Sequence, residues 1–200
     1  MTLDVEVVLF DGFDELDAIG PFEVFAAAAS EADLAVRLVT LEPTDRVVAS
    51  HGLRIEPDGV LGEPDLLVVP GGGWSSPDGG VRRVVDEGTL AEAVAALAAD
   101  GTAVASVCTG ALVLAEAGLL EGRPATTHHT ATDDLAAYAE VVDARVVDGG
   151  EVVTAGGVTS GIDLALWLLE REFGAELAEA GARRLEHERR GEVVRPSADG

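Results

Sequence analysis

Lysine is absent from this chain of 200 residues, and all 13 basic residues are arginine. Aspartate and glutamate number 37, which leaves a formal net charge of -24. A surface of this kind repels nucleic acid and anionic membranes, so neither is an expected partner. The acidic residues are spread along the chain, which argues against a disordered acidic tail as their explanation.

Two explanations of this composition stay open. Acid-rich sequences without lysine are typical of salt-loving organisms, whose cytoplasm screens the repulsion between carboxylates. A genome of high GC content also replaces lysine with arginine, but it does not require so many acids.

Aromatic residues make up only 4% of the chain, and no apolar run is long enough to span a membrane. The acidic N-terminal residues lead directly into a strand pattern, so no signal peptide is recognised. The single cysteine, Cys108, excludes an intramolecular disulfide and a metal site with several cysteine ligands. We therefore expect one cytoplasmic domain over residues 1–200, with a flexible tail over about 190–200.

Short apolar runs alternate with helical segments along the chain. The expected strands include Val5–Phe10, Leu34–Leu41, Asp65–Pro70 and Ala103–Val107. Gly20-Pro21 is expected to open the first helix, because proline is tolerated in a first helical turn. This alternation predicts an α/β fold with a mostly parallel sheet and helices on both faces.

Ligands of an open α/β sheet bind beyond the carboxyl ends of its strands. Four segments with polar or glycine residues are expected to meet at that edge, although they are distant in sequence. They are Asp11–Asp17, Gly71–Gly73, Cys108–Gly110 and Thr126–His129.

Cys108 follows an expected strand and stands directly before an expected helix. The positive end of the helix dipole favours a thiolate there, and a thiolate is a nucleophile. The alternative is that Cys108 is a small buried apolar residue, as lone cysteines often are. The flanking glycine and the convergence of segments favour the nucleophile.

Asp17 and the glycine-rich segment Gly71–Gly73 are expected to lie beside the thiol. A carboxyl beside a thiolate should have a raised pKa and could donate its proton, although Asp17 could equally be a helix-dipole acid. Backbone amides near Gly72, Gly73 and Thr109 could stabilise negative charge on a reacting substrate, although a triple glycine can also be an ordinary turn.

His128 and His129 are adjacent, a spacing that suits neither one helix face nor a single metal ion. We expect no metal and no cofactor. The two histidines are candidate substrate-binding residues, and the alternative is a polar strand end. His51 and His187 are expected on the surface.

Five motifs together resemble the ThiJ/PfpI superfamily, over nearly the whole chain to about Phe173. They are Leu16-Asp17-x-x-Gly20-Pro21, Val69-Pro70-Gly71-Gly72, Ser106-Val-Cys108-Thr-Gly110, the run from Ala117 to His128, and the run from Thr154 to Asp163. The resemblance implies a flavodoxin-like, glutamine amidotransferase-like three-layer sandwich and a homodimer.

Within that superfamily the chain is most similar to the isocyanide hydratases and to the related ligand domain of AraC-type regulators. The resemblance implies that Cys108 is the nucleophile, that Asp17 is the acid/base, and that Thr109 matches the threonine of that branch. The chain departs from the PfpI-type proteases, which have histidine where Thr109 stands. It also departs from the hydratases at His129, where that branch usually has tryptophan.

The function expected from these residues is the hydration of a small electrophilic substrate, such as conversion of an isocyanide to an N-substituted formamide. The alternatives are a glyoxalase- or deglycase-like enzyme acting on α-oxoaldehydes, and a non-enzymatic sensor in which Cys108 is oxidised or a ligand binds. A DNA-binding regulator is disfavoured by the charge of the chain.

Overall fold

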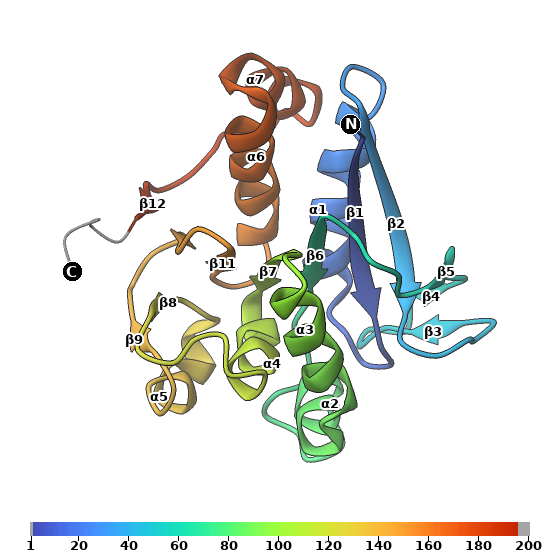
Figure 1. Ribbon diagram of the computed structural model, residues 1–200, viewed down its shortest axis with the longest axis vertical. Coiled ribbons are helices and arrows are strands. Elements are labelled where there is room, and N and C mark those ends of the chain that lie inside the picture. The colour runs from blue at the N-terminus through green and yellow to red at the C-terminus, as the bar shows by residue number, and fades with distance from the viewer. Residues whose placement is uncertain (1, 196–200) are drawn as a thin grey trace.

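The computed structural model describes residues 2–195, which form an eight-stranded sheet between two layers of helices (Figure 1). The strands run in the order β12-β10-β11-β7-β6-β1-β2-β5. Neighbouring strands are parallel except β10 and β11, which are antiparallel. Their bounds are Leu3–Leu9 (β1), Leu34–Thr40 (β2), Gly59–Val60 (β5), Leu66–Val69 (β6), Ala103–Val107 (β7), Val146–Asp148 (β10), Val152–Ala155 (β11) and Val193–Val194 (β12).

The helices cover both faces, as predicted. One face packs against α1 (Glu15–Ala28), α6 (Ser160–Phe173) and α7 (Ala175–Arg184), and the other against α2 (Gly80–Glu87), α3 (Thr89–Ala99) and α4 (Ala111–Glu116). The short helix α5 (Thr132–Leu135) adjoins α4. Two small sheets complete the fold: β3 (Val47–Val48) with β4 (Arg54–Ile55), and β8 (Pro124–Ala125) with β9 (Glu140–Val141). The predicted flavodoxin-like three-layer sandwich is confirmed.

The core follows from the period of two along each strand. In β1, Val5, Val7 and Leu9 face the α1 and α6 layer, whereas Val8 faces the other layer. Because Val5–Leu9 of β1 is buried on both faces, it is an apolar run interrupted only by the buried Glu6. The Glu6 carboxylate is satisfied by Arg37 and by the Gly62 amide, the latter at 2.8 Å.

The first helix begins earlier than the sequence suggested. Asp14 caps it by accepting a hydrogen bond from the Leu16 amide at 3.2 Å, so α1 starts at Glu15. Pro21 therefore lies inside the helix and donates no hydrogen bond to the Asp17 carbonyl. As a result Asp17 belongs to the first helical turn and does not precede the helix.

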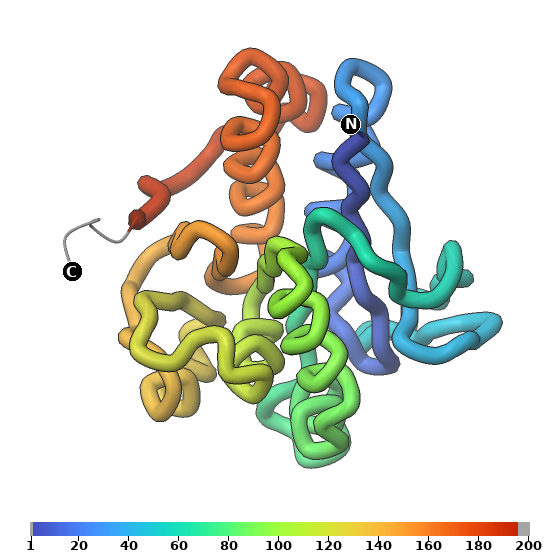
Figure 2. Tube along the Cα trace, in the orientation of Figure 1, coloured from blue at the N-terminus to red at the C-terminus, as the bar shows by residue number. Residues whose placement is uncertain are grey.

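The C-terminal part differs from the prediction in two places. Residues 123–127, which the sequence predicts to be one short strand, contain only the two-residue β8, which pairs with β9 and not with the main sheet. Residues 190–195, expected in a flexible tail, include β12, which pairs in parallel with β10. Figure 2 shows the chain leaving α7 and returning along this outer edge of the sheet. The rest of the predicted tail, 196–200, lies outside the described residues.

Among the described residues, no helix is both long enough and apolar enough to cross a bilayer.

Candidate active site at Cys108

Cys108 occupies a sharp turn between β7 and α4. Its φ of 57° lies in the left-handed region, where residues other than glycine are rarely found. A 3-10 turn over Cys108–Gly110 follows and leads into the helix. A Cβ built at Gly110 would lie 2.3 Å from the Val69 carbonyl oxygen, so only glycine allows the turn to pack this closely against β6. The strained backbone and tight packing present the thiol at the carboxyl edge of the sheet, as predicted.

Asp17 reaches the thiol from α1. Its side chain is fully buried beside the Cys108 thiol, close enough for each group to change the pKa of the other. Oδ2 of Asp17 accepts a hydrogen bond from the Gly71 amide at 3.1 Å, whereas Oδ1 has no nitrogen or oxygen partner among the described residues. Burying a charged carboxyl oxygen without such a partner costs free energy, so the protonated form of Asp17 is favoured.

Gly71 separates Asp17 from Thr109. A Cβ built at Gly71 would lie 2.6 Å from the Thr109 nitrogen and 2.8 Å from Oδ2 of Asp17. The next amide, that of Gly72, donates to Oγ1 of Thr109 at 2.9 Å. The Gly72 amide, which we predicted to face the substrate, is therefore engaged by Thr109, and Gly73 packs against Gly79 and Gly80.

The backbone amides of Thr109 and Val158 lie against the Cys108 sulfur and lower the pKa of the thiol. The sequence predicted that the Thr109 amide would face the substrate, and it did not single out Val158. Val158 lies between β11 and α6 with a φ of 41°, which is unusual for a β-branched residue. The Cys108 amide itself donates to the Gly156 carbonyl at 2.9 Å. Cys108 therefore contacts this segment through its backbone as well as through its sulfur.

The ionisation of the pair differs from the sequence expectation. Burial, followed by the charge of Asp17, raises the pKa of the Cys108 thiol to about 12, although the two amides lower it. The expected preference for thiolate is therefore wrong for the resting site, because the six-residue α4 does not offset burial beside a carboxylate. Burial and the charge of Asp14 raise the pKa of Asp17 to about 7, in the predicted direction.

His128 lies beside the segment that carries Val158. A Cβ built at Gly157 would lie 2.4 Å from Cδ2 of His128, so the ring packs directly on this glycine. Nδ1 of His128 accepts a hydrogen bond from the Thr130 amide at 3.3 Å and is 2.8 Å from Oγ1 of Thr130. Burial and His129 lower the pKa of His128, which favours the neutral ring. His129 is exposed, with its ring centre 4.2 Å from that of His128.

The other two histidines have different surroundings. His51 is exposed and pairs with Glu15 at 2.7 Å, whereas His187, expected on the surface, is largely buried and pairs with Asp163 at 2.9 Å. Asp14, Glu15 and His51 bring three possible metal ligand atoms within 4.8 Å of one another. The Glu15 carboxylate already accepts hydrogen bonds from the His51 and Leu53 amides, which is the pattern of a helix-to-hairpin link.

The fold and the site define an α/β protein with a strained, buried cysteine at the carboxyl edge of a flavodoxin-like sheet and a carboxyl group beside the thiol. The sequence model of the DJ-1/PfpI family matches residues 4–171. The chain therefore belongs to the DJ-1/PfpI family.

Individual relatives agree with this assignment. An isonitrile hydratase from Pseudomonas putida is 37% identical over 191 residues, covering 94% of this chain and 79% of the relative. A ThiJ/PfpI family protein from Pseudomonas syringae has a similar crystal structure, with a TM-score of 0.77 and 26% identity over 100% of this chain and 78% of that one. Drosophila melanogaster DJ-1beta gives a TM-score of 0.79 at 25% identity, covering 94% of this chain and 100% of that one.

Proposed function

We propose that this protein is a cysteine-dependent isocyanide (isonitrile) hydratase, which adds water to R–NC and releases the N-substituted formamide R–NH–CHO. The observation that carries the proposal is the adjacent pair of Cys108 and Asp17, buried together at the carboxyl edge of the sheet. The similarity to the Pseudomonas putida isonitrile hydratase supports this substrate class.

In the proposed first step, the Cys108 sulfur forms a bond to the terminal carbon of the isocyanide. The thiol proton passes to the Asp17 carboxylate as the S–C bond forms, and Asp17 then delivers it to the same carbon. The product is a thioimidate, Cys108–S–CH=N–R, and Asp17 is again a carboxylate. The S–H bond has been added across one carbon, so no external acid or base is consumed.

In the proposed second step, water attacks the thioimidate carbon. Asp17 takes a proton from the water and gives it to the nitrogen, which produces a carbon bearing S, OH and NH–R. The C–S bond then breaks with its electron pair on sulfur, and Asp17 transfers the hydroxyl proton to that sulfur. Formamide leaves and the Cys108 thiol is restored.

The pKa values of the two groups suit this exchange of one proton. With a pKa of about 7, Asp17 is present in both protonation states at neutral pH, as an acid/base that works in both directions requires. The Thr109 and Val158 amides stabilise negative charge on sulfur as the thiol loses its proton and as the C–S bond breaks. A thiol with a pKa of about 12 needs this help, because its resting thiolate fraction is very small.

The test is a product assay on the purified protein with a small alkyl isocyanide, with the formamide quantified by NMR. We expect turnover by the wild-type protein and none by Cys108→Ala, whose fold is checked by circular dichroism. A parallel assay supplies methylglyoxal and measures lactate. Lactate without formamide would replace the proposal with the glyoxalase alternative, and absence of both products would favour a sensor.

A homodimer is part of the proposal. Its support is a set of apolar side chains exposed where α1 meets the β3–β4 hairpin: Leu16, Val48 and Leu53. The hydrogen bonds of Glu15 to His51 and Leu53 place these two elements against each other. Light scattering coupled to size exclusion should give twice the chain mass, and Leu53→Asp should shift the protein toward monomer.

A further inference from the structure

The amide of Val158 lies against the Cys108 sulfur, and the backbone of Val158 holds a strained conformation. A β-branched residue with a φ of 41° costs free energy and persists only where its surroundings fix it. The two residues before it, Gly156 and Gly157, are the most flexible kind and do not fix it by themselves. The ring of His128 packs on Gly157 and the Val158 carbonyl accepts from the Gly161 amide at 3.2 Å, so neighbouring elements hold the strained residue in place.

Arg145 contacts the segment on both sides of Val158. Its guanidinium donates to Oγ1 of Thr159 at 2.9 Å, and its carbonyl accepts from the Gly156 amide at 3.0 Å. Gly156 in turn accepts the Cys108 amide. Arg145 is thus connected to the strained residue through its direct neighbour Thr159 and to the cysteine through Gly156.

Asp163 holds the Arg145 guanidinium in place. The Asp163 side chain is 5% exposed, and its Oδ2 accepts from Nε of Arg145. A planar guanidinium can bind a carboxylate with one nitrogen and a hydroxyl with another, which fixes its orientation. Because Asp163 lies in the first turn of α6, the same contact also ties Arg145 to the helix that follows Val158.

The C-terminal segment, residues 187–194, makes further contacts with Asp163 and Arg145. Oδ1 of Asp163 accepts from Nε2 of His187 at 2.9 Å and from the Arg190 amide at 3.2 Å, and Gly191 packs against the Arg145 side chain. These residues lie beyond residue 171, where the match to the family model ends. The pairing of β12 with β10 anchors the far end of the segment.

We propose that Arg145 is a positioning residue for Cys108, which fixes the Val158 amide against the sulfur through Thr159, and that Asp163 and the C-terminal segment hold Arg145 in its place. The inference rests on the proposed function only in taking Cys108 as the reacting group. It assigns a role in the chemistry to residues that touch neither the substrate nor the sulfur.

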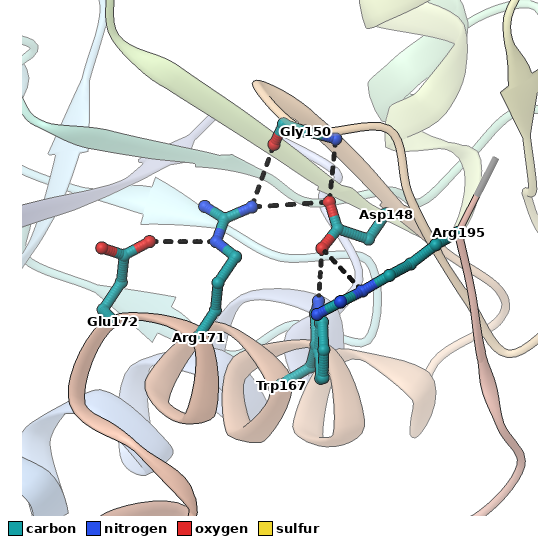
Figure 3. Close-up of polar contacts among 6 residues, drawn as sticks. All are labelled: Asp148, Gly150, Trp167, Arg171, Glu172 and Arg195. Carbon is teal, nitrogen blue, oxygen red and sulfur yellow. Dashed lines mark hydrogen bonds and ion pairs between the residues drawn. The ribbon is translucent and has the colours of Figure 1, made fainter. Parts of the chain in front are cut away.

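The chain offers a matched control at the other end of α6. Arg171 pairs with Asp148 at 3.5 Å, and Asp148 also binds Trp167 and lies 3.9 Å from Arg195 (Figure 3). The side chains of Arg171 and Asp148 are 24% and 6% exposed, close to the 21% and 5% of Arg145 and Asp163. This pair lines an open pocket of about 970 Å³ at the amino ends of β1, β6 and β7, the opposite edge from Cys108.

The experiment measures the rate of alkylation by iodoacetamide between pH 7 and 10 for the wild-type protein, Arg145→Gln, Thr159→Val and Arg171→Gln. Cys108 is the only cysteine, so incorporation reports on it alone. Asp17 and His128, the titratable groups beside the sulfur and Gly157, are unchanged in all variants. Urea unfolding of each variant shows how much stability each substitution costs.

We expect Arg145→Gln to slow alkylation by roughly three- to tenfold at each pH, because a weakened amide contact raises the free energy of the thiolate. Thr159→Val, which keeps the Arg145–Asp163 pair, should also slow alkylation. If Arg145→Gln does not fold, the alkylation rate of Thr159→Val decides the test. Arg171→Gln should lose comparable stability and keep the wild-type rate.

Wild-type alkylation in both Thr159→Val and a folded Arg145→Gln would overturn the proposal, and so would an equal slowing in Arg171→Gln. Iodoacetamide is not a substrate of the proposed hydratase, so this result stands even if no formamide is formed. If formamide is formed, kcat should fall in Arg145→Gln with little change in KM, because the lost contact acts on sulfur and not on substrate binding.

Discussion

Replacing Asp17 with asparagine should change thiol reactivity and turnover in opposite directions. The charge of Asp17 is the second cause, after burial, of the raised pKa of Cys108. Removing a like charge at hydrogen-bond distance lowers a pKa by about one to two units, because burial remains. The thiolate fraction at a fixed pH near 8, and with it the alkylation rate, should rise by about 10- to 100-fold.

Turnover of the same variant should fall by about 10²- to 10⁴-fold, because asparagine cannot accept and return the thiol proton. Alkylation with iodoacetamide and formamide production are measured on the same preparation of Asp17→Asn. A variant with unchanged or slower alkylation would refute the electrostatic account of the pair. A variant with wild-type turnover would refute the role of Asp17 as acid/base.

The substitution should also change how stability depends on pH. The pKa of Asp17 is raised from an ordinary 3.8 to about 7, so the folded protein holds a proton that the unfolded chain loses between these values. Stability from this group is therefore present below about pH 4 and is lost as pH rises through about 7. The shift of about 3 units corresponds to an upper limit of about 4 kcal/mol.

Urea unfolding of wild type and Asp17→Asn at pH 4 and pH 8, at constant KCl, measures this contribution of Asp17 to the free energy of unfolding. The variant should gain stability relative to wild type by up to a few kcal/mol at the higher pH, because asparagine remains uncharged. The other carboxylates are common to both proteins and cancel in the comparison. A stability difference that is the same at both pH values would contradict the raised pKa.

Three further predictions concern the surroundings of the pair. Asp14→Asn keeps the helix cap but removes a charge that raises the pKa of Asp17, so the pH profile of turnover should shift to lower pH; an unshifted profile would argue against this coupling. Gly71→Ala should lose activity and stability, because its Cβ would meet Thr109 and Asp17, whereas Gly59→Ala, with nothing within 4 Å, should be close to neutral in both assays. Thermal unfolding should shift to higher temperature from low to molar KCl, because salt screens a net charge of -24, and a melting temperature independent of salt would count against adaptation to high salt.

The positions of Cys108 and Asp17 could be predicted because each follows from a local signal and one general rule. The run of apolar residues before Cys108 and the glycine after it indicate a strand-to-turn junction. The carboxyl-edge rule then brings the loop after β1 to the same place. The layers of the fold follow from the same alternation of strands and helices.

Val158 could not be predicted in the same way. Its contribution is a backbone amide, and its identity as a β-branched residue argues against the strained conformation that it adopts. The signals in the sequence were the pair of glycines before it and its place in the motif from Thr154 to Asp163, and neither indicates a contact with the cysteine. Arg145 and His187 were likewise missed, because their partner Asp163 is distant in sequence and its burial emerges only from packing.

The ionisation of the thiol was mispredicted for a related reason. Proximity to a helix N-terminus is visible in the sequence, but the degree of burial and the sign of the nearest charge are not. In the folded protein both act against thiolate and exceed the stabilisation by two amides. The balance of these effects, and not the presence of the cysteine, sets the chemistry of the site.

The central claim is that the Cys108 sulfur adds to the substrate carbon while Asp17 accepts and returns one proton. The most direct measurement is the intact mass of the protein quenched with acid within milliseconds to seconds of mixing with an alkyl isocyanide. We predict a transient mass increase equal to the whole isocyanide, located on Cys108 by peptide mapping and absent from Cys108→Ala. Formamide production by wild type with no such adduct at any time, or with equal turnover in Cys108→Ala, would contradict the claim.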